Sequence, residues 1–552
     1  MPERPQERHE HCGPSKGTST EAAGAGESIG GFKVRLVTTD EMRAIDSRAI
    51  EGLGIPGLTL MENAGMGIVQ FIESELGDPG GARIVIICGK GNNGGDGFVI
   101  ARGLRELGAK VGVYLLGKPD ELTGDARTNY ERLEPGSVSE LPDEGGLPDL
   151  LSEMAGAELI IDAIFGTGFD GAPRGLHRDV IAGINVSGRP VLAVDVPSGL
   201  NASSGAREGE CVIASWTCTM ALPKRGFYLH PGREAAGIVH VVDIGIPEDV
   251  ITAVHPMRRV LTEEEASRLL PKRDPGGHKG TFGRVAVLAG SVGYTGAAAL
   301  ASLAALRSGA GLVTLGIPGS LNDILEAKLT EVITCPLAET VERSLSVAAL
   351  PGVESLLDSA DAMALGPGLS QNRETQELIR AIVSDLSIPC VIDADGLNAL
   401  TPEDVGARQG DAPVVITPHP GEMARLCGRT MSEVLERREE VAADVATRAR
   451  ATVVLKGAAS VVADAAGEIY LNPTGNDGMA SAGTGDVLTG IVAALLGRGM
   501  PALDAGVLGA YIHGRAGDIA ACAVGRTALI AGDLVDLLPD VYSELESGVC
   551  EG

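Results

Sequence analysis

The chain has 552 residues, of which 44% are hydrophobic and 22% charged, so it can bury sizeable cores and is not disordered throughout. Its 74 acidic residues outnumber 45 Lys and Arg, and a net charge of −29 argues against a nucleic-acid partner. Aromatic residues make up only 3% while glycines number 77, which is typical of an α/β protein and not of a β-sandwich.

The first 33 residues are polar and rich in Gly, Ser and Glu, which predicts a disordered tail over 1–33. His9, His11 and Cys12 could hold a metal ion there, but the composition favours a solvated tail. We expect no signal peptide and no membrane partner, because the tail lacks an apolar segment and no apolar run approaches about 20 residues. The nine scattered cysteines include no C-x-x-C pair, which favours a reducing, cytoplasmic compartment.

Two helix-start signals divide the rest of the chain. Thr38 with Glu41, and Thr262 with Glu265, form T-x-x-E capping boxes, and each precedes a new series of alternating apolar and helical segments. We therefore expect two domains, at 34–255 and 256–552.

Short apolar runs predict buried parallel strands in both domains, with helices on both faces of each sheet. In the first domain they lie at 83–88, 110–116, 158–162, 190–195 and 238–243. In the second they lie at 284–290, 312–317, 361–365, 391–395, 413–417 and 452–456. Ligands of such sheets bind beyond the carboxyl ends of the strands, and the unusual motifs of this sequence fall at those ends.

A glycine-rich segment at 89–97 follows the first of these strands and contains G-x-G-x-x-G before a helix. The next strand lacks the acidic residue of a dinucleotide-binding fingerprint, and no G-K-[ST] of a P-loop is present. The segment is either a tight turn or a polar backbone cradle for an ion. Two further strands end at Asp162 and Asp195, and Ser198 follows the second. A single such Asp is often a turn residue, but three polar loops in one sheet favour a site.

The segments 55–65, 92–97, 162–168, 195–200 and 222–232 together resemble the NAD(P)H-hydrate epimerase family, which has a Rossmann-like three-layer α/β/α fold. The resemblance spans about residues 38–250. It implies that the hydrated nucleotide contacts Asn92, Asn93, Gly94, Gly95, Asp96, Gly166, Thr167, Gly168, Phe169, Asp170, Gly171 and Ala172.

The same resemblance implies a potassium ion on Asn93, Asp162 and Ser198, and a substrate contact at Asp195. Because epimerisation at C6 of the hydrated ring requires proton transfer, we expect Asp195 to be the catalytic acid/base. Asn201 stands where the family usually has Asp, a departure that affects one secondary contact.

The strongest motif of the second domain runs from Asn472 to Asp486 and leads into an apolar helix. A Gly-Thr-Gly turn at a helix N-terminus directs free amides at an anion, and Asp486 follows in the first turn. Asp486 could simply favour the helix dipole. An anion site beside a carboxylate nevertheless suits phosphoryl transfer to a hydroxyl, with Asp486 as the catalytic base.

This G-x-G-D motif resembles the ribokinase-like superfamily, and the segments 278–291, 294–311, 364–369, 393–400, 417–426 and 455–460 resemble the ADP-dependent NAD(P)H-hydrate dehydratases. The resemblance covers about 261–549 and implies a second α/β/α domain. Contacts to the hydrate would come from Ala297, Gly368, His419 and Asp486. The adenine nucleotide would bind Lys456, Gly457, Ala458, Ala459, Ser460 and Gly485, with Ser460 in place of the usual Thr.

The two resemblances predict one bifunctional enzyme that interconverts R and S hydrates of NADH and NADPH and dehydrates the S form with ADP and Mg²⁺. We also expect a homo-oligomer. A small-molecule kinase with an N-terminal regulatory domain is the alternative, and it would accumulate a phosphorylated product. A first domain that binds ligand without turnover is the third possibility.

Overall fold

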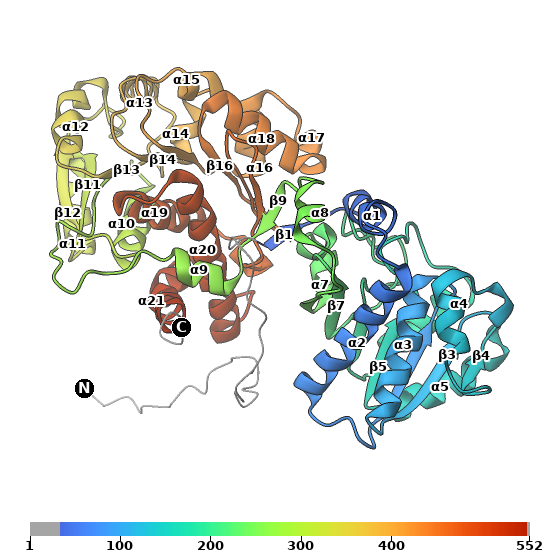
Figure 1. The fold of residues 1–552 in the computed structure, drawn as a ribbon. Helices are drawn as coiled ribbons and strands as arrows, with labels where there is room; N and C mark the ends of the chain where they lie inside the picture. The colour runs from blue at the N-terminus through green and yellow to red at the C-terminus, as the bar shows by residue number, and fades with distance from the viewer. Residues whose placement is uncertain (1–33, 549–552) are drawn as a thin grey trace, which may run out of the picture. The chain divides into compact units, whose positions relative to one another are not determined.

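The computed structural model describes residues 34–548, which form two compact units, Val34–Arg258 and a unit that begins at Arg259 (Figure 1). Each unit is described by itself. The predicted tail at 1–33 lies outside the described residues. Within the part of the chain that is described, no helix is long and apolar enough to cross a membrane.

The first unit contains a seven-stranded sheet in the order β4-β3-β2-β5-β6-β7-β8, and all of its strand pairs are parallel. The strands are β2 (Arg83–Cys88), β3 (Lys110–Leu115), β4 (Val138–Glu140), β5 (Leu159–Ala163), β6 (Val191–Val194), β7 (Trp216–Met220) and β8 (Ile238–Val242). The sequence analysis missed β4 and β7. β7 carries Thr217, Cys218 and Thr219 in place of a purely aliphatic run, although all three side chains are buried.

Helices cover both faces of this sheet. Ile84 and Ile86 of β2 pack with one buried cluster and the alternate residues Val85 and Ile87 with another, as the two-residue period of a strand requires. The first cluster includes α1 (Thr39–Ser47), α2 (Gly57–Leu76), α3 (Asn92–Glu106) and α8 (Glu248–Thr252), and the second includes α5 (Leu147–Gly156) and α6 (Leu176–Val186). Smaller elements are the strand β1 (Val34–Leu36) and the helices α4 (Gly124–Glu131) and α7 (Gly232–Ala236).

The sheet of the second unit runs β9-β18-β17-β16-β15-β14-β13-β10-β11-β12. The strands β12, β11, β10, β13, β14, β15 and β16 are neighbours in this order, and each pair is parallel. β17 and β18 are antiparallel additions that the sequence analysis did not predict. The bounds are β9 (Arg258–Val260), β10 (Arg284–Leu288), β11 (Leu312–Pro318), β12 (Ile333–Leu337), β13 (Ala362–Leu365), β14 (Cys390–Ile392), β15 (Val414–Ile416), β16 (Thr452–Leu455), β17 (Val461–Ala463) and β18 (Ile469–Leu471).

The helices of the second unit also form layers on the sheet. α10 (Thr295–Arg307), α19 (Thr484–Gly497), α20 (Ala502–Val524) and α21 (Ala531–Ser547) enclose the largest buried cluster together with alternate strand residues. The remaining helices are α9 (Glu263–Leu269), α11 (Asn322–Lys328), α12 (Leu350–Leu357), α13 (Arg373–Ser384), α14 (Asp395–Asn398), α15 (Pro402–Gly406), α16 (Pro420–Cys427), α17 (Met431–Glu436) and α18 (Arg438–Ala449). Val287 joins the cluster while its neighbours Ala286 and Leu288 are equally buried, so both faces of β10 are covered.

Both predicted capping boxes are present. Thr38 caps α1 and pairs reciprocally with Glu41, and Thr262 caps α9 and pairs with Glu265. Each box satisfies amides that the first helical turn leaves without a partner. The boundary between the compact units, Arg258/Arg259, lies close to the expected 255/256.

Candidate active sites

The first candidate site lies where β5 and β6 end. Asp162 is the last residue but one of β5 and is fully buried, as is Ser198 in the segment after β6. The Ser198 hydroxyl donates to Asp162 Oδ1 at 2.6 Å, and the Ser198 amide donates to Asp162 Oδ2 at 2.8 Å. Burial raises the pKa of Asp162 to about 6, against the opposing hydrogen bonds from Ser198.

Asn93 completes the oxygen-donor set that the sequence analysis assigned to a cation. Its side chain is buried, and its amide nitrogen has no hydrogen-bond partner among the described residues. Carboxylate, hydroxyl and carboxamide oxygens are hard ligands that suit a group 1 or group 2 cation. The residues present therefore fit the expected ion, although no group of three or more His, Cys, Asp or Glu side chains in the described region could hold a metal.

Asp195 follows β6 directly and is in the left-handed backbone region, with φ of 64°. Its Oδ2 accepts hydrogen bonds from the Thr167 amide, at 3.1 Å, and from the Thr167 hydroxyl. Its Oδ1 lies 2.8 Å from Lys224 Nζ, and it accepts from Thr219 Oγ1 and the Met220 amide, both at 3.3 Å. Both carboxylate oxygens are therefore fixed by the protein.

These contacts determine the charge of Asp195. Burial alone would raise its pKa, but the Lys224 ammonium and the hydrogen bonds from Thr167 and Met220 outweigh burial and hold the pKa below its usual value. A carboxylate of this kind is ionised at neutral pH and is a weak proton donor. The acid/base role of Asp195 stays a prediction from sequence, and its ionised carboxylate can also accept a hydrogen bond from substrate.

The pKa of Asp96, by contrast, is shifted upward. The residue lies on α3 and is buried, and burial together with the charge of Asp195 raises its pKa well above the usual value. Asp46 of α1 behaves similarly: burial raises its pKa to about 6, with Lys224 lowering and Asp195 raising it. The charge of Asp195 thus raises the pKa of both Asp46 and Asp96, while the Lys224 ammonium lowers the pKa of Asp46 and Asp195.

The glycine-rich segment is helical, which corrects the expected loop. Residues 92–97 form the first turns of α3, and only Asn92 of them is exposed. A Cβ at Gly94 would overlap the Gly89 carbonyl oxygen, and one at Gly97 would lie 2.7 Å from Cys88 Sγ. These glycines are required for the close approach of the helix to β2. The motif therefore brings the start of α3 against the carboxyl end of this strand.

The predicted substrate loop, Gly166–Ala172, lies at the same carboxyl end of the sheet. A Cβ at Gly166 would lie 3.1 Å from Asn93 Oδ1 and 3.3 Å from Asp195 Oδ2, so this glycine separates two expected site residues. The Phe169 ring stacks on Phe165 with 4.4 Å between centroids. The rest of the loop, Gly168, Asp170, Gly171 and Ala172, is exposed or partly exposed.

Asn201, the departure from the family pattern, has a structural role. Its Nδ2 donates to Asp170 Oδ1 at 2.8 Å, and its Oδ1 accepts from the amides of Ser203 and Ser204. An Asp here would repel Asp170, so Asn201 and Asp170 form a matched pair between two loops.

The second candidate site lies at the N-terminus of α19. Gly483 is the N-cap, with φ of 93°, and Thr484 begins the helix, so Asp486 is in the first turn as predicted. Asp486 is partly buried, and no hydrogen bond to its carboxylate is present among the described residues. Burial and the charge of Asp393 raise its pKa to about 7; Lys456 lowers it, while Glu422 and Asp395 raise it.

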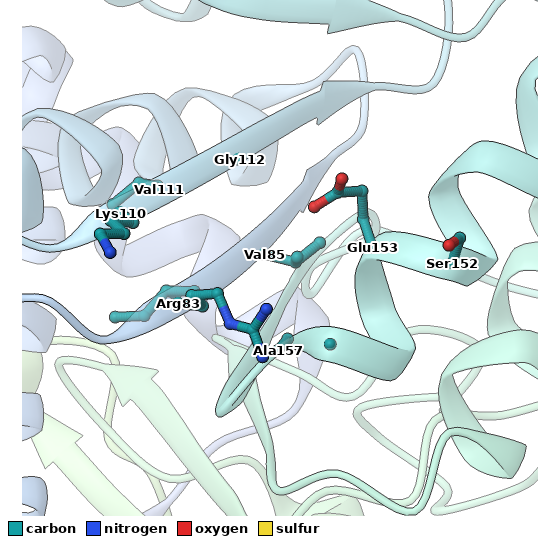
Figure 2. A pocket seen from close by; sticks show the side chains of 10 residues that line it. Arg83, Val85, Lys110, Val111, Gly112, Ser152, Glu153 and Ala157 are labelled. Carbon is teal, nitrogen blue, oxygen red and sulfur yellow. The ribbon is translucent and has the colours of Figure 1, made fainter.

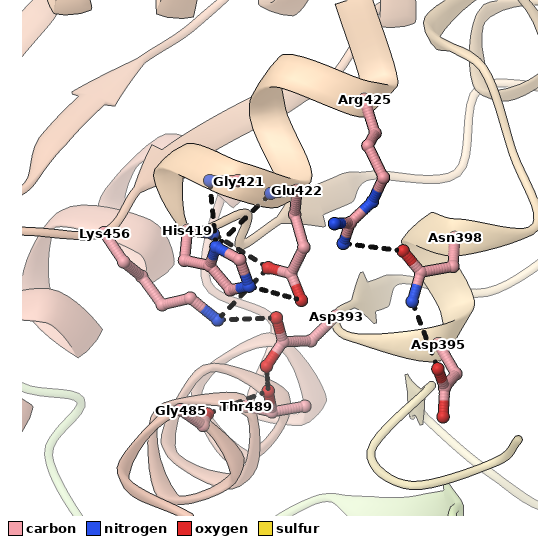
Figure 3. Close-up of polar contacts among 10 residues, drawn as sticks. All are labelled: Asp393, Asp395, Asn398, His419, Gly421, Glu422, Arg425, Lys456, Gly485 and Thr489. Atoms are coloured by element: carbon pink, nitrogen blue, oxygen red, sulfur yellow. Dashed lines mark hydrogen bonds and ion pairs between the residues drawn. The ribbon is translucent and has the colours of Figure 1, made fainter. Parts of the chain in front are cut away.

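A buried ion pair faces this helix N-terminus (Figure 3). Lys456 Nζ donates to Asp393 Oδ1 at 2.7 Å and lies 3.9 Å from Glu422 Oε2. The other oxygen of Asp393 accepts from Thr489 Oγ1 of α19 at 2.8 Å. A Cβ at Gly485 would lie 3.1 Å from the ammonium. The Lys456 ammonium therefore lies beside Gly485, at the start of α19.

His419 is the N-cap of α16. Its Nδ1 accepts from the amides of Gly421 and Glu422 at 3.0 and 3.3 Å, and Glu422 caps in return through the His419 amide (Figure 3). The imidazole is half exposed. Nε2, the other ring nitrogen, lies 3.4 Å from Glu422 Oε1, so Glu422 contacts both the amide and the ring of His419.

The other predicted contacts lie on neighbouring loops. A Cβ at Gly368 would lie 3.2 Å from the Ala297 Cβ, so these two small residues are adjacent. The backbone after β16 is held by Arg438, which donates to the carbonyls of Lys456 and Ala458. Gly457 and Ala459 have φ of 144° and 53°, and Ser460 Oγ donates to the Gly457 carbonyl at 3.2 Å.

The first unit also has a cavity of about 560 Å³ (Figure 2). It is lined by Arg83 and Lys110, which begin β2 and β3, and by Ser152 and Glu153 of α5. These are the amino ends of the strands, whereas the expected ligand contacts are at the carboxyl ends. The residues lining this cavity include none of the predicted site residues.

Two family models match the chain: one described as NAD(P)H-hydrate dehydratase over residues 285–540, and one described as YjeF-related protein N-terminus over 57–226. The bifunctional NAD(P)H-hydrate repair enzyme of Moorella thermoacetica is 47% identical over 518 residues, which cover 93% of this chain and 98% of that protein. The chain belongs to the bifunctional NAD(P)H-hydrate repair enzymes. The member of this family from Thermofilum pendens is 38% identical over 513 residues. This match covers 93% of this chain and 97% of that protein.

Among solved structures, an ADP/ATP-dependent NAD(P)H-hydrate dehydratase from Bacillus subtilis, co-crystallised with ATP and Mg²⁺, is 32% identical. It covers 52% of this chain and 98% of its own, with a TM-score of 0.45. Membership of the repair-enzyme family confirms the predicted two-domain α/β organisation, with a ribokinase-like second domain.

Several side chains of these two sites were not predicted from sequence. Lys224 and Thr219 contact Asp195, and Asp393 and Glu422 surround Lys456. The motifs of Lys224, Asp393 and Glu422 were noticed, whereas Thr219 lies on the missed strand β7. Nothing in the spacing of Lys224 from Asp195 indicates an ion pair. For Asp393, the signal was its position directly after a buried strand.

Proposed function

We propose that the chain repairs hydrated NADH and NADPH: its first unit interconverts the R and S hydrates, and its second dehydrates the S form with ADP, releasing AMP and phosphate. The observation that carries the proposal is Asp486 at the N-terminus of α19, facing the Lys456–Asp393 pair. Membership of the repair-enzyme family supports it independently.

The dehydration follows from this geometry. Hydroxide is a poor leaving group, so the 6-hydroxyl is first phosphorylated. Asp486 accepts the hydroxyl proton, the hydroxyl oxygen bonds to the β-phosphorus of ADP, and AMP leaves. The ring-nitrogen lone pair then expels phosphate from C6, and loss of a proton from C5 restores the reduced nicotinamide. With a pKa of about 7, Asp486 is both basic enough to take the proton and partly ionised at neutral pH.

The residues around Asp486 bind the reactants in this proposal. The amides at Thr484 and Gly485 and the Lys456 ammonium stabilise the charge of the transferring phosphoryl group. The segment from Lys456 to Ser460 holds the nucleotide, and Ala297, Gly368 and His419 contact the hydrate. Mg²⁺ arrives with the nucleotide phosphates, because no carboxylate cluster in the described residues is arranged to hold a metal by itself.

In the first unit, Asp195 contacts the substrate. The start of α3 and the loop Gly166–Ala172 enclose the substrate. Asn93, Asp162 and Ser198 hold potassium, which supplies a fixed positive charge beside the substrate when bound. The Asp162–Ser198 hydrogen bonds, which bring a carboxylate and a hydroxyl oxygen together at the end of β5, support this assignment. A cytoplasmic location is part of the proposal, and it is supported by the seven described cysteines, all of which are free.

The test is the near-ultraviolet absorbance of reduced nicotinamide while the full chain acts on a mixture of R and S NADPH hydrates with ADP, Mg²⁺ and K⁺. We expect full recovery of the band from both epimers, with AMP and phosphate released. A plateau once the S form is consumed would make the first unit a binding module. A stable phosphorylated product without recovery would identify a kinase.

A further inference from the structure

Lys224 is the side chain of the first site that the proposed chemistry does not yet use. It is only 1% exposed, although it is a lysine. Its Nζ lies within 3.1 Å of four oxygens, those of the Asp195 carboxylate, the Thr219 hydroxyl and the Met220 and Leu222 carbonyls. An ammonium has three protons, so every donor of Lys224 is engaged inside the protein.

The backbone around Lys224 is fixed from both sides. Val37 donates its amide to the Pro223 carbonyl at 3.1 Å and accepts from the Arg225 amide at 2.8 Å. The strand-like segment before α1 therefore holds the lysine in register with the end of β6. A flexible lysine is in this way restricted to one position, with its charge directed at Asp195.

We propose that Lys224 is a positioning residue of the epimerase site, which keeps Asp195 ionised and immobile so that Asp195 binds and orients the substrate instead of carrying the proton. This inference rests on the proposed function of the first unit. Lys224 does not need to touch the substrate for this role, because it is buried behind the carboxylate it holds.

The contacts of Asp195 favour an orienting role over a structural one. Its Oδ2 faces Gly166, on the other side of which lies Asn93, so the oxygen fixed by Thr167 borders the substrate loop. Its Oδ1 is the atom that shares Thr219 with Lys224. One oxygen is thus held from behind by the lysine while the other presents a fixed acceptor to the site.

The charges around the pair make the lysine necessary. The titratable groups that face Asp195 are Lys224, Asp46 from α1 and Asp96 from α3. Without Lys224, three carboxyl groups would share this region with no ammonium beside them, and burial would raise the pKa of Asp195. A neutral Asp195 would lose its function as a charged acceptor.

The experiment measures conversion of purified R hydrate to reduced cofactor by the full chain from pH 6 to pH 9, with dehydration of S hydrate followed in the same samples. Lys224→Met should lower the kcat of R conversion at pH 7 by about 100-fold, and the rate should recover as pH rises and Asp195 ionises. Lys224→Arg keeps the charge, so its kcat for R conversion should stay within about tenfold of that of the unmodified chain. Its rate should also depend on pH in the same way as that of the unmodified chain. Lys118→Met, on an exposed lysine of the same unit, is the matched control.

A double-mutant cycle decides whether Lys224 acts through Asp195. The double variant Lys224→Met with Asp195→Asn should be no slower than Asp195→Asn alone. If the two losses multiply, or if Lys224→Met keeps the pH dependence of the unmodified chain, the positioning role is wrong. Should Lys224→Met fail to fold, Thr219→Val removes the shared hydroxyl and should give a smaller loss, about tenfold, with the same direction of pH shift. An unmodified chain that converts no R hydrate would instead refute the proposed function.

Discussion

The two units place an aspartate near a buried or partly buried lysine at the carboxyl end of a parallel sheet, yet the pKa of the aspartate shifts in opposite directions. Asp195 contacts its lysine directly, accepts hydrogen bonds from two further side chains and has a lowered pKa. Asp486 has no direct lysine contact among the described residues, because Lys456 pairs with Asp393, and its pKa is raised to about 7.

The difference shows how one kind of ion pair serves two purposes. In the first unit the lysine fixes the charge of the carboxylate that faces the substrate loop. In the second it is held by another carboxylate, and Asp486 is left free to exchange protons. The partner of the lysine, and not the presence of a lysine, therefore decides whether the pKa of the neighbouring aspartate is lowered or raised.

The largest effect should come from removing the base. Asp486→Asn should slow dehydration of S hydrate by about 100- to 10,000-fold, the range typical of general-base catalysis. ADP affinity should stay within about threefold, because nucleotide contacts are assigned to the Lys456–Ser460 segment. Rates from near-ultraviolet absorbance and titration calorimetry with ADP check both parts, with exposed Asp540→Asn on α21 as the control. Simultaneous loss of nucleotide binding would contradict the assignment of Asp486.

The second prediction compares the pH dependence of the two activities. A base must be ionised, and the pKa of Asp486 is about 7, so kcat for dehydration should fall about tenfold for each pH unit below 7 and level off above it. Asp195 has a lowered pKa and stays ionised over that range, so it should cause no fall in the rate of R-hydrate conversion below pH 7. Initial rates with each purified epimer between pH 5.5 and 8.5 measure both curves. A dehydration rate that is flat through pH 7 would exclude Asp486 as the base.

The two units should also differ in their response to potassium. Coordination needs the ionised form of Asp162, whose pKa is about 6 in the absence of the ion, so protons compete with potassium below that pH. Saturating K⁺ should raise the Tm of the first unit by about 2–5 °C at pH 8 and by much less at pH 5. Differential scanning calorimetry resolves this, with lithium as the comparison ion.

Ser198→Ala, which removes the hydroxyl bound to Asp162, should abolish the potassium-dependent shift in Tm, whereas Ser187→Ala at the end of α6 should retain it. An equal shift at both pH values would show that the ion does not bind Asp162.

The smallest effect concerns the charge beside Asp486. Glu422 raises the pKa of Asp486, so Glu422→Gln should move the midpoint of the dehydration pH profile downward by about 0.3–0.5 unit. Gln preserves the capping box with His419, which keeps the fold of α16 intact. Glu433→Gln makes the same change in the exposed capping box of α17 and should leave the midpoint in place. A midpoint shift in both variants would point to a global effect of net charge.

Sequence reasoning succeeded where a local pattern has one physical meaning. The capping boxes at Thr38 and Thr262, and Asp486 in the first turn of α19, could be predicted because they depend on spacing of three or four residues. It failed for β7, whose threonines are buried only because their hydroxyls find partners such as the Ala236 carbonyl. It also misread 92–97, since a glycine required by helix–sheet contact is indistinguishable in sequence from one required by a turn.

The unpredicted part of each site consists of long-range pairs. Lys456 and Asp393 are 63 residues apart, and Lys224 and Asp195 are 29 apart, so only the folded sheet brings them together. Proton affinity depends on those pairs, and for that reason the role of Asp195 could not be derived from its motif alone.

The boundary at Arg258/Arg259 has a consequence for biosynthesis, because each unit is continuous in the chain over its described residues. The last sheet strand of the first unit, β8, is synthesised before the second unit begins. At about 5–20 residues per second, translation of the remaining chain takes roughly 15–60 s, which is ample time for a domain to fold. The nascent epimerase unit can thus mature while its catalytic partner is still being made.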